Sequence, residues 1–252
     1  MDVLVDTDRV ATIDCARCPF NHRAGFRPHE STETLSVRSF KRREIDIPAG
    51  ETVYGPDLRM GELFTVLEGW GHRNTELADG RRQLLNFVFP GDFLGLQAVL
   101  DGPREHSVVA LTPMRLCVFE ASDLPEHIAR APELSHDVIW TAASEERMLE
   151  GHLVGVGRRN ALERLAYMLA YINDRGVASG LREAQEPITP LTQSLLADML
   201  GMSLVHTNKT LRQLQADALV RWRGRRVFID DIAKLRRVAR WQGLSDRLRR
   251  FV

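Results

Sequence analysis

The side chains of this 252-residue chain best suited to redox or metal chemistry are its three cysteines. Cys15 and Cys18 form a Cys-x-x-Cys pair, and Cys117 lies far along the chain. Three cysteines cannot make a disulfide framework, and a cytoplasmic setting keeps thiols reduced. They are therefore packing residues or ligands: Cys117 a buried strand residue, Cys15 and Cys18 a relic, a thiol pair or half of a zinc site.

Groups that would indicate an enzyme are not evident. The eight histidines are scattered, no His-x-His or acid-plus-histidine group recurs on one strand pair, and no nucleophile–base set stands out. A cupin-type barrel enzyme is therefore disfavoured, and we expect no enzymatic activity.

Residues 190 to 214 have the pattern of two short helices joined by a tight turn. Thr192 and Ser203 can cap the two helices, Gly201 permits the turn, and Ala197 is small where the helices must approach. The pattern predicts a helix-turn-helix with apolar contacts from Leu195, Leu196, Leu200, Leu211 and Leu214.

In such a unit the second helix lies in the major groove of DNA and its first half touches base edges. The amide of Asn208 can pair with adenine, the ammonium of Lys209 can donate to guanine, and Val205 can contact a thymine methyl group. The candidate contacts on this helix are Ser203, Val205, His206, Asn208, Lys209 and Arg212.

Two short β-runs around Gly224 follow this helix and carry an arginine cluster. We expect a wing that places guanidinium groups on phosphates, with Arg223, Arg225 and Arg226 as the candidates. From residue 201 onward the chain has thirteen Lys and Arg against four Asp and Glu, a net charge of +9 in a chain of net charge zero. A solvated basic surface alone would explain the charge, but its place beside a helix-turn-helix favours DNA binding.

The elements that must position these residues begin with a polar lead-in, residues 1 to 36, in which a helix can start near Ser31. Short apolar runs separated by glycine-containing turns then predict an antiparallel sandwich or barrel. The expected strands are residues 45–47, 52–54, 63–67, 84–89, 108–111 and 116–119.

After Pro125 the apolar spacing becomes helical, with steps of three and four. Such a seam is typical of a two-stranded coiled coil and predicts a homodimer, although the stripe could instead pack against its own barrel. Gly151 and Gly155 weaken this helix by about 1 kcal/mol each, which burial of the seam must offset. The seam residues are Ile139, Ala142, Glu146, Leu149, Leu153 and Val156.

Two further helices are expected. One runs from Asn160 to about Asp174, with Gly176 as its stop. The other is a basic amphipathic helix over residues 232 to 252. We expect its apolar residues to pack on the winged domain, although the helix could also touch the DNA backbone; these residues are Leu235, Val238, Ala239 and Leu248.

No apolar run approaches the roughly 18 residues that a membrane span needs. Met1 to Thr12 alternates acidic and apolar residues, unlike a secretion signal. We therefore expect a cytoplasmic protein without membrane contact.

Over about residues 38 to 230 the order of these parts resembles the CRP/FNR superfamily. Its characteristic turns are similar to the segments beginning at Ile47, Leu67, Ala78 and Phe89, and the start of its post-dimerisation helix is similar to residues 158 to 165. The resemblance implies an α+β fold: a lead-in (1–36), an antiparallel β-roll of cyclic-nucleotide-binding type, a jelly roll (37–122), a dimerisation helix region (123–157), a winged helix-turn-helix (158–231) and a basic extension (232–252).

The resemblance also implies a function. A homodimeric transcriptional regulator would bind a palindromic promoter site and RNA polymerase, under redox, oxygen or small-molecule control. The alternative is a β-roll ligand-binding module that acts through protein partners, which leaves the arginine-rich wing unexplained. FNR has Glu, Ser and Arg where this chain has Val205, Asn208 and Lys209, so we expect a target other than the standard FNR box.

By this resemblance we do not expect cyclic AMP to be a ligand. Members that bind it have a cassette that opens with Gly-Glu and ends with Arg-Ser. Here the corresponding stretch runs from Gly91-Asp92 to His106-Ser107 with no arginine beside Ser107, although Arg104 nearby leaves another anionic ligand open.

The segment from Cys18 to Ala24 further resembles the lead-in of FNR-like oxygen sensors from alphaproteobacteria. Those sensors hold a cubane iron–sulfur cluster on four thiolates, and Cys15, Cys18 and Cys117 are similar to three of them. Phe26 stands about where another cysteine is expected, so a cluster would need a further ligand from the chain or from outside. The residues considered for it are His22, His29 and an aspartate.

Overall fold

The computed structural model describes residues 13–56, 58–59, 61–100, 105–245 and 247–252. The expectations placed on Met1 to Thr12 and on Arg104 lie outside these residues.

The lead-in consists of two 3₁₀ turns, η1 (Cys15–Arg17) and η2 (Pro19–His22), followed by helix α1 (Ser31–Phe40). Glu30 and Glu33 form a reciprocal capping box at the start of α1. Val37 and Phe40 of α1 are buried against the β-roll. For this reason α1 continues across the boundary expected between residues 36 and 37.

The β-roll is made of two four-stranded antiparallel sheets. One has the order β1 (Arg43–Ile47), β8 (Met114–Glu120), β3 (Glu62–Glu68), β6 (Phe93–Leu94), and the other β2 (Thr52–Tyr54), β7 (Ser107–Ala110), β4 (Gly71–Glu76), β5 (Arg82–Val88). The expected antiparallel roll is confirmed. Strand β4 was missed because it buries polar side chains, His72 and Asn74, in place of an apolar alternation.

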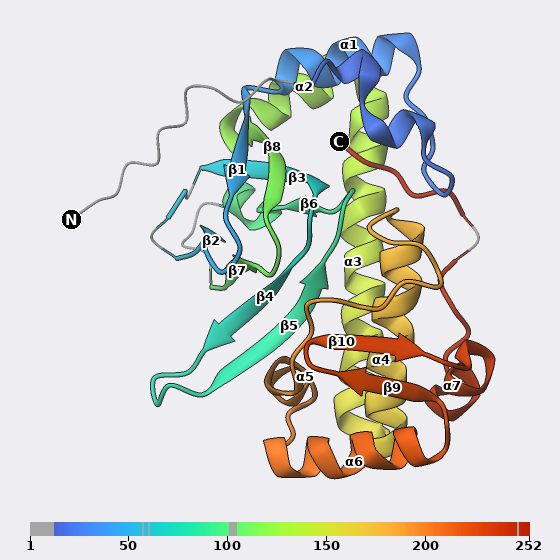
Figure 1. Ribbon diagram of the computed structural model, residues 1–252. Coiled ribbons are helices and arrows are strands. Elements are labelled where there is room, and N and C mark those ends of the chain that lie inside the picture. Colours follow the sequence, from blue (N-terminus) through green and yellow to red (C-terminus); the bar gives the residue numbers. More distant parts are fainter. Residues whose placement is uncertain (1–12, 57, 60, 101–104, 246) are drawn as a thin grey trace.

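Beyond the short turns η3 (Leu96–Val99) and η4 (Ala121–Asp123), the chain forms helices α2 (Leu124–Arg130) and α3 (Pro132–Arg158). Pro132 opens α3, where its missing N–H costs nothing. Helix α3 runs along the molecule from α1 and α2 to the helices of the C-terminal half (Figure 1). Within the described ranges, none of the helices combines the length and apolar character needed to cross a bilayer.

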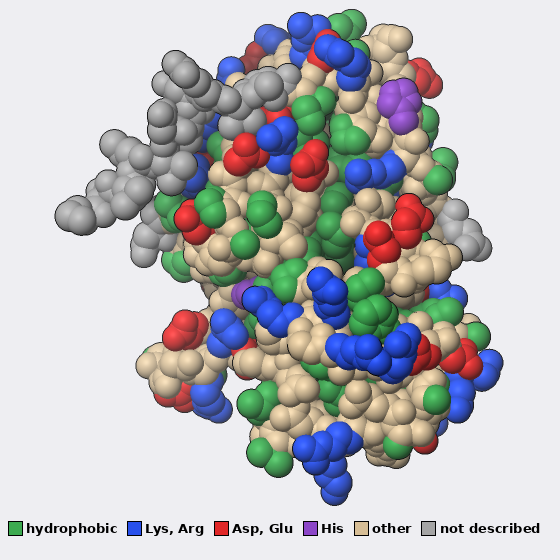
Figure 2. Space-filling model, in the orientation of Figure 1, with side chains coloured by type: hydrophobic (Ala, Val, Ile, Leu, Met, Phe, Trp, Pro, Cys, Tyr) green, Lys and Arg blue, Asp and Glu red, His purple; other side chains and the backbone are tan. Residues whose placement is uncertain are grey.

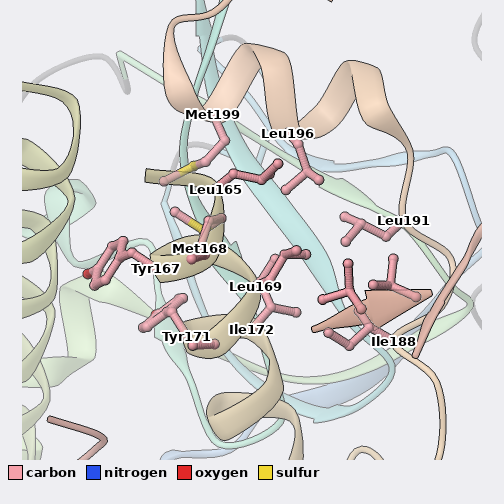
Figure 3. Close-up of a cluster of buried hydrophobic side chains, with 14 of the residues drawn as sticks. Leu165, Tyr167, Met168, Leu169, Tyr171, Ile172, Ile188, Leu191, Leu196 and Met199 are labelled. Carbon is pink, nitrogen blue, oxygen red and sulfur yellow. The ribbon is translucent and has the colours of Figure 1, made fainter. Parts of the chain in front are cut away.

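The C-terminal half contains α4 (Ala161–Ala178), α5 (Gln193–Leu200), α6 (Leu204–Ala216), the hairpin β9 (Val220–Arg223) and β10 (Arg226–Ile229), and α7 (Ile232–Ala239). Apolar residues of α4 and α5 meet in its core (Figure 3). The predicted stop of α4 at Gly176 is wrong. A Cβ there would lie 3.2 Å from Nε of Arg182, so Gly176 lets this arginine cross a helix that continues to Ala178.

The helix expected over residues 232 to 252 is correct only for Ile232–Ala239. Arg240 has a φ of +49° and ends α7, and residues 240–245 and 247–252, which we call the return segment, run back toward α1 (Figure 1). Phe251 and Val252 are buried against the β-roll and the lead-in, whereas Leu248 is half exposed. The predicted packing on the winged domain is thus limited to α7. Leu235 and Ala239 are buried and Val238 packs on the same core, but Leu248 does not.

Candidate nucleic-acid interface and sensor pockets

The two helices of the predicted helix-turn-helix are capped as expected. The Thr192 hydroxyl accepts a hydrogen bond from the backbone N–H of Leu195, and the Ser203 hydroxyl accepts one from that of His206. Gly201 has a φ of +61°, a left-handed conformation that favours glycine and allows the sharp turn. The five predicted apolar contacts are all buried: Leu195, Leu196, Leu200, Leu211 and Leu214.

The outer face of α6 carries the predicted base-contacting residues. Val205 is 80% exposed, and Lys209 and Arg212 are exposed beside it. Ser203 and His206 are also exposed at the start of the helix. Asn208 is only partly exposed, and its side-chain Oδ1 is covered and has no hydrogen-bond partner within the described residues. The outer face of α6 is therefore accessible for contact with a groove of DNA, with Asn208 at the edge of this face.

The predicted wing is the hairpin β9–β10. Its strands pair from Arg226 opposite Arg223 to Ile229 opposite Val220, and Arg223, Arg225 and Arg226 are all exposed at the turn. Arg221 instead pairs with Asp230 at 2.8 Å and lies over the Phe228 ring. Lys and Arg side chains gather over this hairpin and at the edge formed by α6 (Figure 2).

The β-roll contacts the first helix of the helix-turn-helix directly, which the sequence did not indicate. Arg82 of β5 pairs with Asp198 of α5 at 2.5 Å, and the Gln83 side-chain amide donates to the backbone carbonyl of Met199 at 3.2 Å. Trp70 donates from Nε1 to the carbonyl of Thr189 at 3.1 Å. The helix-turn-helix that contains α6 is thus held against the sheet that contains β5.

All six predicted seam residues lie on one exposed face of α3. Ile139 is 67% and Leu153 is 73% exposed, and Ala142, Glu146, Leu149 and Val156 are also exposed. The opposite face is buried against the rest of the chain, through Leu134, Asp137, Thr141, His152 and Gly155. The alternative that the stripe packs on its own barrel is therefore wrong: the barrel leaves it open.

A buried polar network joins β5, α3 and α4. His152 of α3 lies 3.1 Å from the Tyr167 hydroxyl and 3.3 Å from Oδ1 of Asn86, which also accepts from the Tyr171 hydroxyl at 3.2 Å. Burial lowers the pKa of His152 to about 4, and nearby Arg159 and Arg175 act in the same direction. The imidazole is therefore neutral at pH 7.

The residues matched to the cyclic-nucleotide cassette are engaged within the chain. The Asp92 carboxylate accepts from Arg175 at 2.5 Å, from Arg249 at 2.7 Å and from the backbone N–H of Phe89 at 2.9 Å. His106 is buried, with Nε2 lying 2.9 Å from the Tyr54 hydroxyl. Both side chains are therefore held by contacts within the chain.

The three cysteines lie around one small pocket under the return segment. Cys15, Cys18 and Cys117 line a space of about 20 Å³, which holds about one water molecule. Burial raises the pKa of all three thiols, that of Cys18 to about 11 and that of Cys117 to about 12. In the absence of a bound metal the neutral thiol is therefore the favoured form at pH 7.

This arrangement does not fit an iron–sulfur cluster. Phe251 closes the pocket by stacking on His29 and by an edge contact with Phe20, and Thr65 donates to the Val252 carbonyl at 2.5 Å. Phe26, at the position of the missing cysteine, is buried in the same aromatic group. In the part of the chain that the structure describes, no three His, Cys, Asp or Glu side chains are placed to hold a metal ion.

Comparisons with known proteins agree with this architecture. A family model for the cyclic nucleotide-binding domain matches residues 44–131, and one for the Crp-like helix-turn-helix domain matches residues 163–238. The transcriptional activator protein FnrL of Cereibacter sphaeroides is 29% identical over 225 residues, 88% of this chain and 90% of FnrL. The nitrogen fixation regulation protein FixK of Bradyrhizobium diazoefficiens is 30% identical over 188 residues, 73% of this chain and 78% of FixK.

The fold is also found among solved structures. FixK2 from Bradyrhizobium japonicum superposes with a TM-score of 0.68 at 24% identity, over 80% of this chain and 98% of that chain. Identity at this level shows a shared fold.

Proposed function

Because this chain belongs to the CRP/FNR family of transcriptional regulators, we propose that it binds a palindromic promoter site as a cytoplasmic homodimer and there contacts RNA polymerase. Its relatives are transcription factors, and the chain is a DNA-binding regulator of this type, not an enzyme.

The observation that carries the proposal is the open outer face of α6 beside the exposed arginines of the hairpin. Val205, Lys209 and Arg212 project from the helix, while Arg225 and Arg226 lie at the turn of the adjoining hairpin. Such a pair of surfaces suits a helix in the major groove with guanidinium groups on the flanking phosphates. Base contacts are assigned to Val205, His206, Asn208, Lys209 and Arg212, and phosphate contacts to Ser203, Arg223, Arg225 and Arg226.

The homodimer is supported by the exposed seam of α3. Isolated apolar stripes of this length are rare on monomer surfaces, and a two-fold axis along α3 would bury each seam against its copy. A symmetric dimer presents its two reading helices about one DNA turn apart, which makes a palindrome the natural target.

The test is a binding experiment with a site selected from a random-sequence DNA library. We expect Lys209→Ala to weaken binding to the selected site about tenfold, because the ammonium no longer donates to a base edge, and to change non-specific binding much less. Electrophoretic mobility shifts at several salt concentrations measure both affinities.

Lys234→Ala is the matched control, since Lys234 is an exposed lysine on α7, off the reading helix. It should leave the ratio of specific to non-specific affinity unchanged. Equal losses for both kinds of DNA in Lys209→Ala would remove Lys209 from base recognition, and the absence of any selected sequence would remove the proposed function.

A further inference from the structure

A cavity of about 700 Å³ lies where the β-roll, α3, α4 and the return segment meet. We call it the interdomain cavity. Its size is within the range usual for small-molecule sites. Its walls include Val88 and Phe93 from the roll, Trp140 from α3, Tyr167 from α4 and Trp241 from the start of the return segment. The cavity thus joins the sensor half of the chain to the half that carries the reading helix.

Aromatic side chains form one part of this wall. Trp241 makes edge contacts with Tyr167 at 5.3 Å and with Tyr171 at 6.2 Å between ring centroids. Trp140 and Phe93 line the same cavity. Flat apolar walls of this kind suit a ring, because aromatic groups pack face to edge and offset with little loss of freedom.

Arginines form the other part. Five of them line the cavity against two carboxylates, Asp92 and Glu145. Glu145 pairs with Arg73, while Asp92 is shared by Arg175 and Arg249. One carboxylate therefore serves two guanidinium groups, and the site holds an excess of positive charge.

Arg175 is a buried arginine with hydrogen-bond donors that lack acceptors. It is only 4% exposed. Its Nη2 binds Asp92 and its guanidinium also interacts with the Tyr171 hydroxyl, but its Nε and Nη1 have no hydrogen-bond partner of normal geometry in the described ranges. Nε of Arg249 is likewise buried and has no hydrogen-bond partner in the described ranges. Buried donors without acceptors, and a buried charge without full compensation, are costly unless something supplies the missing acceptor.

We propose that the interdomain cavity is an effector site for a small aromatic carboxylate. Its carboxylate accepts hydrogen bonds from Arg175 and Arg249, and its ring lies among Trp140, Tyr167 and Trp241. Binding itself does not depend on the proposed function; the consequence for regulation does. A ligand bound by Arg175 of α4 and by Arg249 of the return segment would fix the DNA-binding half against the β-roll.

The test uses 1-naphthaleneacetate as the probe and 1-naphthaleneacetamide as its neutral counterpart, titrated into the full-length protein by isothermal calorimetry. We expect the carboxylate to bind at least about tenfold more tightly than the amide, since a charge-assisted pair with arginine is lost in the amide. Equal affinities, or no heat with either probe, would overturn the proposal.

Two variants, each with a matched control, locate the binding site. Arg249→Gln should weaken the carboxylate about tenfold and leave the amide unchanged, whereas Arg250→Gln, whose guanidinium pairs with Asp137 at 2.5 Å away from the cavity lining, should change neither. Ser144→Trp should block both probes by filling the cavity, while Ser39→Trp on the exposed side of α1 should not.

If Ser144→Trp binds the probe like the unchanged protein, the probe is held elsewhere and the assignment is wrong. Because calorimetry reads binding directly, a protein that binds the carboxylate but no selected DNA would overturn the proposed function alone. A protein that binds DNA but not the carboxylate would overturn this inference alone.

Discussion

One imidazole, that of His152, links the β-roll to both long helices, and burial makes it harder to protonate in the folded chain. Its pKa is about 4 in the folded chain against 6.5 for an ordinary histidine, because burial disfavours the charged form. The unfolded chain therefore binds a proton that the folded chain does not between these pH values. Stability contributed by the neutral ring is complete above pH 6.5 and is lost as the pH falls toward 4.

We expect His152→Gln to reduce this loss. The full difference corresponds to about 3 kcal/mol between pH 7 and pH 4, so the variant should show a shallower decline of the urea midpoint between pH 6.5 and pH 4.5, even if it starts lower at pH 7. His136→Gln, at an exposed position of α3, should retain the original slope. Identical slopes for His152→Gln and the unchanged protein would show that another group controls the decline.

Phe251 decides how accessible the three thiols are. Its ring is 2% exposed and covers the pocket that Cys15, Cys18 and Cys117 line. We expect Phe251→Ala to lower stability by about 3 kcal/mol, as for other large-to-small changes in a core, and to speed labelling of the cysteines by an aromatic disulfide reagent at pH 8.

Leu248→Ala is the matched change in the same segment, because Leu248 is half exposed and packs little. Its labelling rate should stay at that of the unchanged protein. Should Phe251→Ala label no faster, the return segment does not protect the thiols.

Among the elements, helix α3 has two faces with different partners. One packs on the roll and on α4, and the other exposes the seam. We expect Leu149→Glu to convert a dimer into a monomer, since it places a charge at the centre of two facing apolar seams, and to abolish tight binding to a palindromic site. Sedimentation velocity at micromolar concentration measures the change.

Leu35→Glu provides the comparison, because Leu35 is 63% exposed on α1, away from the seam. That variant should sediment like the unchanged protein. An intact Leu149→Glu dimer would place the dimer interface on a different surface.

Across the whole molecule, the β-roll and the DNA-binding half share one core. Trp70, Leu84, Phe87 and Phe89 of the roll belong to the same buried cluster as the apolar residues of α4, α5 and α6. The contacts of Arg82 with α5 and the polar network at Asn86 lie along the same junction. The position of α6 therefore depends on the β-roll, and the interdomain cavity lies beside this junction.

Local chemistry along the chain was enough to predict much of this protein. The caps at Thr192 and Ser203, the turn at Gly201, the strand alternation of the roll and the spacing of the seam each depend on residues a few positions apart. Short-range sterics and hydrogen bonds decide such features, so the winged helix-turn-helix and the antiparallel roll could be foreseen.

Contacts between distant residues decided the rest. Helix α4 continues past Gly176, where Arg182 packs across it, and Phe251, near the end of the predicted basic helix, instead packs among aromatic residues of the lead-in. The same packing sets the pKa values of the cysteines and brings Arg175 and Arg249 onto one carboxylate. The burial of the thiols and the sharing of one carboxylate by two arginines arise only when the chain is folded. For this reason the spacing of residues in the sequence did not predict them.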